Sequence, residues 1–200
     1  MYSEIVKYCS DLALTFDKIP AERKEKLLKI ADCSTIHKAK NVSLLYVCTH
    51  NARRSHFGQI WANVAAQFYG ITTLKAFSAG TELTAFHPNA VKIFTKIGFK
   101  VSSDNKLKNP TYTISFGEKA SVTCFSKTMQ HPTLPSKNFI AIMTCDDAEK
   151  NCPFLPGALC RFPLTYKDPK VYDGTALADE KYFQTSETIA RESLYLFSLL

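Results

Sequence analysis

Apolar residues recur at helical intervals through residues 3–38. One such stripe lies before Pro20 and a second lies after it, and each would form the apolar face of one helix. Their members are Ile5, Cys9, Leu12 and Phe16 before the proline, and Leu27, Ile30 and Ala31 after it. The pattern therefore predicts a pair of helices at the start of the chain.

A strand, a polar loop and a helix follow this pair. Residues 42–48, VSLLYVC, form a near-continuous apolar run with the length and β-branched content of a buried strand in a parallel sheet. Apolar residues then recur at helical intervals from Phe57 to Phe68. The same order repeats with a strand over 73–80 and a helix over 87–99. Two successive βα units predict a doubly wound α/β sheet.

Further segments extend this pattern. Residues 138–145 and 161–166 have the composition of two more strands, and residues 179–200 have the spacing of a closing helix. Between them, the runs TYTISF and SVTCF flank GEKA and predict a hairpin over 111–125.

Composition and charge limit the classes of function. With 200 residues, 46% of them hydrophobic, the chain fits one globular domain. It has neither an apolar run long enough to cross a bilayer nor an export signal, so no membrane association is expected. The net charge of +7 permits anionic partners. Nucleic acid is not expected, because basic and aromatic residues are not interleaved on one predicted face.

Cysteine content favours a cytoplasmic protein. The seven cysteines are an odd number at irregular spacing, which suits a reducing compartment. Cys9, Cys33, Cys124 and Cys160 belong to no motif and are expected to be core or surface thiols. No closely spaced cysteine pair predicts a structural metal site.

The stretch YVCTHNARRS, residues 46–55, places a cysteine where the first strand meets a helix. Backbone N–H groups of such a loop and the positive end of the helix dipole favour an anion, and they favour the thiolate of Cys48. Arg54 can hold two oxygens of an oxyanion, and Ser55 can donate a hydrogen bond to the sulfur. Asn51 can brace the loop. The alternative is an inert buried cysteine beside incidental basic residues.

These residues resemble a known family. Cys48, five intervening residues, Arg54 and Ser55 are similar to the anion-binding loop of the low-molecular-weight protein tyrosine phosphatases and of the thioredoxin-coupled arsenate reductases that share their fold. SAGTE with HPNAV (78–91) and TCDDAEKNCPFLPG (144–157) resemble the arsenate reductase branch. The resemblance covers residues 41–200, the expected catalytic domain, and leaves 1–40 as a helical extension.

The resemblance implies a doubly wound three-layer sandwich around a central parallel four-stranded sheet. It also implies an oxyanion-binding loop in which every residue after the nucleophile takes part. This loop comprises Thr49, His50, Asn51, Ala52, Arg53, Arg54 and Ser55. No tightly bound cofactor and no metal are expected.

A thiolate that displaces a leaving group needs a proton donor on the leaving side. Asp168, in KDPK, resembles the Asp-Pro general acid of the family, although an Asp-Pro pair also commonly starts a turn. Asp173, in YDGT, is the second candidate.

Cys145 and Cys152 distinguish the two branches of the family. Seven positions correspond to about two helical turns, or about 10 Å, so a disulfide between them requires the intervening DDAEKN to unwind. The resemblance implies a relay in which Cys48 takes up arsenate, Cys145 attacks Cys48, and Cys152 attacks Cys145. Thioredoxin then reduces the last disulfide. In the alternative, both cysteines are only packing residues.

Three features depart from the family pattern. His50 stands where glycine is usual and must tolerate an unusual backbone angle or shift the loop. Gln59 replaces a glutamate of potassium-binding arsenate reductases, so that cation is not expected. The stretch 100–137 is longer than usual and could reshape the mouth of the pocket.

The sequence thus predicts an arsenate reductase coupled to thioredoxin. The alternative is a tyrosine phosphatase that hydrolyses phosphotyrosine or related aryl phosphates through phosphocysteine. A third hypothesis is a binding module for phosphate or a phosphoprotein, in which His50 has ended catalysis and the N-terminal helices form a docking surface.

Overall fold

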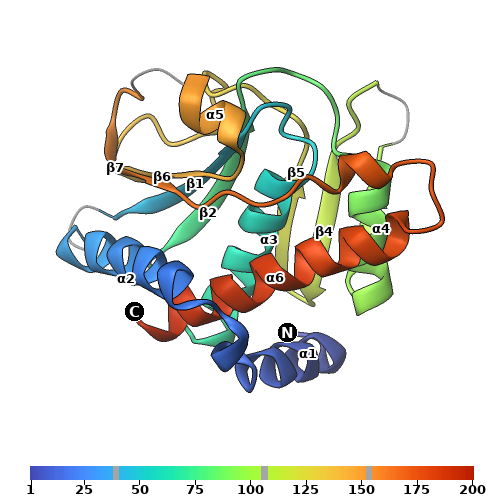
Figure 1. The fold of residues 1–200 in the computed structure, drawn as a ribbon, viewed down its shortest axis with the longest axis horizontal. Coiled ribbons are helices and arrows are strands. Elements are labelled where there is room, and N and C mark those ends of the chain that lie inside the picture. The colour runs from blue at the N-terminus through green and yellow to red at the C-terminus, as the bar shows by residue number, and fades with distance from the viewer. Residues whose placement is uncertain (38–40, 105–107, 152–154) are drawn as a thin grey trace.

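A four-stranded parallel sheet forms the centre of the protein (Figure 1). This computed structural model describes residues 1–37, 41–104, 108–151 and 155–200. The strand order is β2-β1-β6-β7, which confirms the predicted doubly wound sheet. The last strand begins before the predicted 161–166. The strands are β1 (Ser43–Cys48), β2 (Lys75–Gly80), β6 (Phe139–Met143) and β7 (Ala158–Pro163).

Helices cover the two faces of the sheet unequally (Figure 1). The helices are α1 (Ser3–Ala13), α2 (Ala21–Ile36), α3 (Arg54–Phe68), α4 (Pro88–Ile97), α5 (Asp146–Asn151) and α6 (Ala178–Ser198). Alternate residues of β1 separate two cores, because Leu44 and Tyr46 pack with Trp61 of α3, whereas Leu45 and Val47 pack with the α5 side. The α3–α6 core is much the larger. The central sheet therefore lies between a thick layer that contains α3 and α6 and a thin layer that contains α5.

The N-terminal helices are part of the large core. Ile5, Cys9 and Leu12 of α1 and Leu27 and Ile30 of α2 are buried, as their spacing predicted. Both helices pack against α6, and a short 3₁₀ segment (Phe16–Lys18) connects them. The apolar stripes of this region are thus explained by contacts within the chain.

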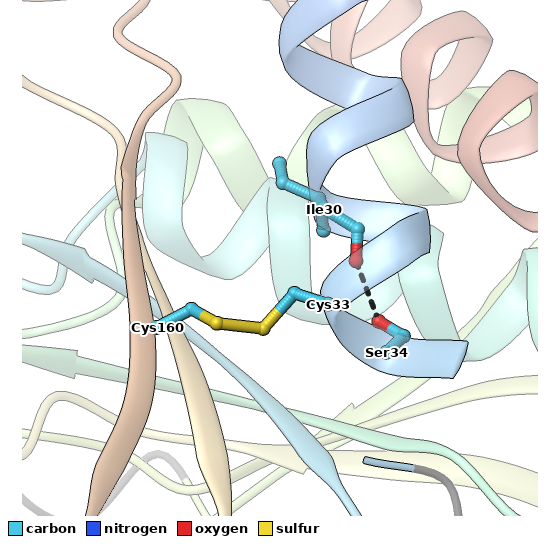
Figure 2. The surroundings of a disulfide bond; sticks show 4 residues. All are labelled: Ile30, Cys33, Ser34 and Cys160. Atoms are coloured by element: carbon cyan, nitrogen blue, oxygen red, sulfur yellow. Dashed lines mark hydrogen bonds between the residues drawn. A yellow bond between two sulfur atoms is a disulfide. The ribbon is translucent and has the colours of Figure 1, made fainter. Parts of the chain in front are cut away.

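A disulfide fastens the end of α2 to β7. Cys33 and Cys160 are bonded with a Cα–Cα distance of 6.9 Å (Figure 2). The expectation that both are unpaired thiols is therefore wrong. Because 127 positions separate them in sequence, only the packing of α2 on the sheet brings the two sulfurs together.

A small antiparallel sheet occupies part of the long 100–137 stretch. It has the order β3-β4-β5, from β3 (Lys100–Ser103), β4 (Tyr112–Gly117) and β5 (Ala120–Cys124). The hairpin of β4 and β5 is as predicted, whereas β3 was not predicted because KVSS is short and largely exposed. In the described part of the chain, no helix is long and apolar enough to cross a membrane.

Candidate functional site

Cys48 ends β1 opposite Gly80 of β2, at the first turn of α3. Its side chain is 4% exposed, and its Sγ lies 3.1 Å from Oγ of Ser55. Asn51 donates a hydrogen bond to that same Oγ at 2.9 Å. Because Oγ of Ser55 accepts from Asn51, its hydroxyl proton is free to be donated to the sulfur.

Asn51 braces the loop between strand and helix. Its Oδ1 accepts a hydrogen bond from the backbone N–H of Lys127 at 2.9 Å, which joins the loop to the segment after β5. Asn51 has a φ of 44°, in the left-handed region that asparagine tolerates better than most residues. The unusual backbone angle of the loop therefore falls on Asn51 and not on His50.

Gly80 allows β2 to approach the loop closely. A Cβ at this position would lie 2.7 Å from the carbonyl oxygen of Thr49 and 2.8 Å from the backbone nitrogen of Asn51. The residues after it hold the loop, because the N–H groups of Thr81 and Glu82 donate to the carbonyls of Cys48 and Thr49. The SAGTE stretch thus acts as the support of the loop, a role that the sequence analysis did not assign to Gly80.

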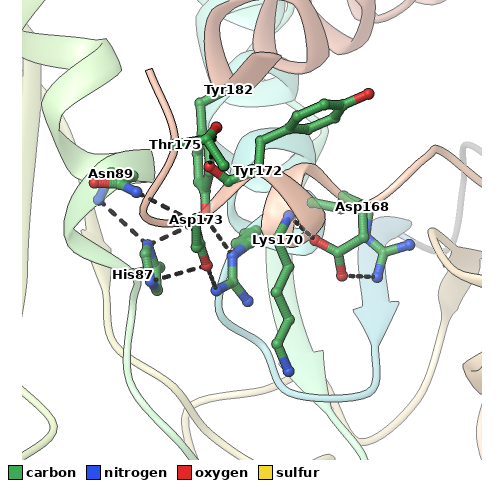
Figure 3. A network of polar contacts seen from close by, with 10 residues as sticks. His87, Asn89, Asp168, Lys170, Tyr172, Asp173, Thr175 and Tyr182 are labelled. Carbon is green, nitrogen blue, oxygen red and sulfur yellow. Dashed lines mark hydrogen bonds and ion pairs between the residues drawn. The ribbon is translucent and has the colours of Figure 1, made fainter. Parts of the chain in front are cut away.

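Arg54 reaches from the start of α3 to the segment after β7. Its Nη1 donates to the carbonyl oxygen of Tyr166 at 2.9 Å, and its Nη2 pairs with Oδ2 of Asp168 at 2.5 Å. Asp168 also accepts from the backbone N–H of Lys170, which caps the 3₁₀ turn Pro169–Tyr172 (Figure 3). Asp168 therefore starts a turn and also faces the loop arginine.

Arg53 points to the other carboxylate. Its Nη2 donates to Asp173 at 2.8 Å, while Tyr182 and Asn89 donate to the second oxygen of that carboxylate at 2.7 and 3.2 Å (Figure 3). Despite the opposing effect of burial, hydrogen bonds from Tyr182 and the charge of Arg53 hold the pKa of Asp173 below its ordinary value. Asp173 is thus a structural carboxylate and a poor proton donor.

These residues enclose a small pocket at the sulfur. Its lining consists of Cys48, His50, Ala52, Arg53, Arg54 and Asp168. An adjoining cavity of ≈ 260 Å³ shares His50, Ala52 and Arg53 and continues to His87 and Lys170. Nε2 of His50 lies 3.3 Å from Glu82 at the mouth. The pocket offers cationic donors to an oxyanion, but its volume of ≈ 10 Å³ holds about one water molecule, so an oxyanion fits only if the lining side chains move. The adjoining cavity has room for a group attached to the anion.

Cys145 lies beside the same loop from the thin face of the sheet. Its Sγ is 3.4 Å from Oγ1 of Thr49, and the N–H of Ala148 in the first turn of α5 donates to it at 3.4 Å. Helix α5 has six residues, in agreement with the short helix expected over DDAEKN. Cys152 lies outside the described residues.

Lys127 was missed by the sequence analysis. It is only 3% exposed, its Nζ donates to the carbonyl of Phe125, and burial lowers its pKa to about 8, against an opposing effect of Cys124. Gln59 is also buried here, and it accepts from Ser78 and donates to the carbonyl of Thr123. A lone basic residue in FSKTM carries no sequence signal for such burial.

One group of potential metal ligands occurs among the described residues. Cys33, His37 and Cys160 place their ligand atoms within 4.8 Å of one another. Both sulfurs are already bonded to each other, so they offer no thiolate to an ion in this structure.

The comparisons with known proteins find arsenate reductases among the sequence relatives. No family model matches the chain. Over 145 residues the chain is 26% identical to an arsenate reductase of Bacillus subtilis, covering 72% of this chain and 86% of that protein.

Solved structures show the same fold. A low-molecular-weight protein tyrosine phosphatase of T. tengcongensis matches 80% of this chain and 99% of its own, with a TM-score of 0.55 and 18% identity. An arsenate reductase of Archaeoglobus fulgidus matches 78% and 98%, with a TM-score of 0.50 and 19% identity. The recognition made from the sequence is confirmed, because the sequence relatives are arsenate reductases and the fold is that of both branches.

Proposed function

We propose that this chain is an arsenate reductase-like enzyme that uses Cys48 as its nucleophile. The observation that carries the proposal is the pocket in which the Cys48 sulfur, the Arg54 guanidinium and the Asp168 carboxyl meet. The sequence relatives, which are arsenate reductases, support the same substrate.

Capture of the oxyanion follows from the positions of these groups. The Cys48 thiolate attacks the arsenic atom, and loop N–H groups with Arg54 stabilise the charge on the oxygens that remain. Asp168 gives its proton to the departing oxygen, which leaves as water. A guanidinium has five N–H donors, so Arg54 can keep its bond to Tyr166 while it turns from Asp168 to the anion.

Reduction needs two electrons from thiols. In the proposed relay, Cys145 attacks the sulfur of Cys48, that disulfide forms, and arsenite departs with the electron pair of the S–As bond. Cys152 then attacks Cys145 and frees Cys48, and the dithiol of thioredoxin reduces the resulting disulfide. The contact of Cys145 with Thr49 supports the first exchange, and the shortness of α5 supports the rearrangement.

A second candidate is a phosphatase acting on phosphotyrosine or related aryl phosphates. Here the same attack forms phosphocysteine, Asp168 protonates the phenolic oxygen, and water hydrolyses the intermediate. The largely apolar cavity beside His50 and His87 favours this candidate, since arsenate alone would leave it empty.

Two assays on one preparation separate these functions. Purified protein is given arsenate, thioredoxin, thioredoxin reductase and NADPH, or an aryl phosphate, and both assays are repeated with Cys145→Ser and Cys152→Ser. Arsenate-dependent NADPH oxidation should fall at least about 10³-fold in either variant, while turnover of an aryl phosphate changes less than about 3-fold.

Two other results would redirect the proposal. NADPH oxidation that survives Cys152→Ser would contradict the relay of three thiols. Tight oxyanion binding with no turnover of either substrate would instead favour a binding module.

The remaining parts of the proposal concern organisation and location. Residues 41–200 form the catalytic domain and 1–40 an extension, of which α1 and α2 pack on that domain. A cytoplasmic location suits a nucleophile and a resolving residue that must remain thiols, whereas the Cys33–Cys160 disulfide is a feature more typical of oxidising compartments.

A further inference from the structure

The first turn of α2 contacts the segment that carries Asp168. Nε and Nη2 of Arg23 donate to the two carboxylate oxygens of Glu192 in α6, at 2.8 and 2.5 Å. Its Nη1 donates to the carbonyl oxygen of Thr165 at 2.9 Å. One residue of the extension thus binds a central helix and the segment after β7 simultaneously.

Tyr166 continues this connection toward the pocket. Its ring lies 4.7 Å beneath the Arg23 guanidinium, and its hydroxyl donates to Glu192 at 2.7 Å. Its backbone N–H donates to the carbonyl of Thr144, so its own carbonyl is fixed where Nη1 of Arg54 meets it. Asp168 follows two residues later and pairs with the same arginine.

The burial of this cluster makes it stiff. The Glu192 side chain is 4% exposed and that of Arg23 is 13% exposed. Burial disfavours the charge of Arg23, but the bonds to Glu192 and Tyr166 outweigh it and raise the pKa of Arg23. The pair lines a cavity of ≈ 530 Å³ together with Thr165, Tyr166 and Asp168. A bidentate arginine–carboxylate pair has one preferred geometry, which fixes the direction of the third donor that Arg23 gives to Thr165.

We propose that Arg23 is a positioning residue for the reaction at Cys48, acting through Thr165 and Tyr166 to set Arg54 and Asp168. The proposal rests on the proposed roles of those two residues. It assigns the extension a part in catalysis, in place of the docking role considered from the sequence.

The first test measures whether Arg23 acts through the general acid. Arg23→Gln, Arg23→Lys and the control Lys29→Gln, an exposed site on the same helix, are assayed with aryl phosphates of differing leaving-group acidity. Arg23→Gln should lower kcat for phenyl phosphate about 10- to 100-fold, with a smaller loss for p-nitrophenyl phosphate, whose leaving oxygen needs less protonation. Arg23→Lys should recover part of the loss, and Lys29→Gln should match the wild type.

A double variant sharpens this result. In an Asp168→Asn background, Arg23→Gln should cause little further loss with phenyl phosphate, since the group it positions is gone. Equal losses for all leaving groups, or losses that multiply fully with Asp168→Asn in a folded variant, would overturn the positioning role. Glu192→Gln, which keeps the shape of the partner, provides an independent variant if Arg23→Gln unfolds.

The second test needs no turnover. Calorimetric titration with inorganic phosphate should show at least about 5-fold weaker binding for Arg23→Gln, because Arg54 loses its fixed support. If the wild type turns over neither substrate, the proposed function fails while this titration still decides the inference. An unchanged dissociation constant would then overturn it.

Discussion

Arg53 and Arg54 are neighbours in the chain, yet each binds a different carboxylate. Arg53 donates to Tyr182 of α6 and to Asp173 in the segment between β7 and α6. Asn89 of α4 donates to the same Asp173 and completes the cluster. Arg54 binds the segment after β7, through Tyr166 and Asp168. The side chains of Asp168 and Asp173 are almost equally exposed, at 28% and 29%.

The two pairs therefore differ in partners rather than in burial. Both oxygens of Asp173 accept bonds from side chains of other elements, so that carboxylate fastens helices together. One oxygen of Asp168 accepts a hydrogen bond from the backbone of its own turn, and the other pairs with Arg54. An entering oxyanion can take Arg54 from Asp168 without breaking contacts between helices, and this contrast can be tested directly.

The largest expected effect concerns the acid. Asp168→Asn keeps the size of the side chain but removes its proton, so turnover of phenyl phosphate should fall about 10²- to 10⁴-fold. Asp173→Asn should lower it less than about 10-fold. Steady-state rates at saturating substrate measure both. Equal losses in the two variants would contradict the assignment of Asp168 as the general acid and of Asp173 as a structural carboxylate.

A smaller effect, in the opposite order, is expected for stability. Asp173→Asn leaves Arg53, whose side chain is 9% exposed, without an ionised partner, so the free energy of unfolding should fall by about 2 kcal/mol. For Asp168→Asn the loss should be below about 1 kcal/mol. Urea denaturation at neutral pH measures both values, and a larger loss for Asp168→Asn would contradict the comparison.

The smallest effect is a pH dependence of the free energy of unfolding, which arises at His87 beside Arg53 and Asp173. Burial and the charge of Arg53 lower the pKa of His87, although Asp173 and Asp168 oppose this. Below pH 6.5 the unfolded chain therefore binds more protons at this site, and stability falls as the pH drops, by at most about 1.4 kcal/mol per unit. His87→Asn, which keeps a cap for α4, should make unfolding less sensitive to pH between 6.5 and 5.

The wild type and His87→Asn are compared because both retain His56, a second histidine that makes stability depend on pH. His56 is fully buried and its pKa is also lowered well below the ordinary value, so the wild type retains some slope from that residue. The quantity to examine is the difference between the wild type and His87→Asn at each pH. A difference that stays constant from pH 6.5 to 5 would contradict the assignment to His87.

Local signals in the sequence predicted the framework of the site. The apolar run ending at Cys48 and the helical spacing after Ser55 are properties of adjacent residues, so β1, the loop and α3 followed from them. The proposed bond from Ser55 to the sulfur and the bracing by Asn51 followed for the same reason, because all three residues lie within eight consecutive positions of the sequence, from 48 to 55.

Contacts between distant segments could not be predicted in this way. Nothing near Arg53 or Arg54 indicates which of Asp168 and Asp173 each will bind, since the answer depends on how the segment after β7 crosses the start of α3. The pairing of Arg23 with Glu192, 169 positions away, depends on the packing of α2 on α6. The backbone angle expected at His50 fell one residue later because hydrogen bonds outside the loop fix Asn51.

The Cys33–Cys160 bond closes a covalent ring that contains β1, the loop from Cys48 to Ser55, the β4–β5 hairpin and Cys145. A single break in the backbone inside that ring leaves two pieces that are still joined. A protease that nicks the protein there would yield one band on a non-reducing gel and two after a reductant is added. The architecture thus protects the connectivity of the catalytic half against cleavage for as long as the bond remains oxidised.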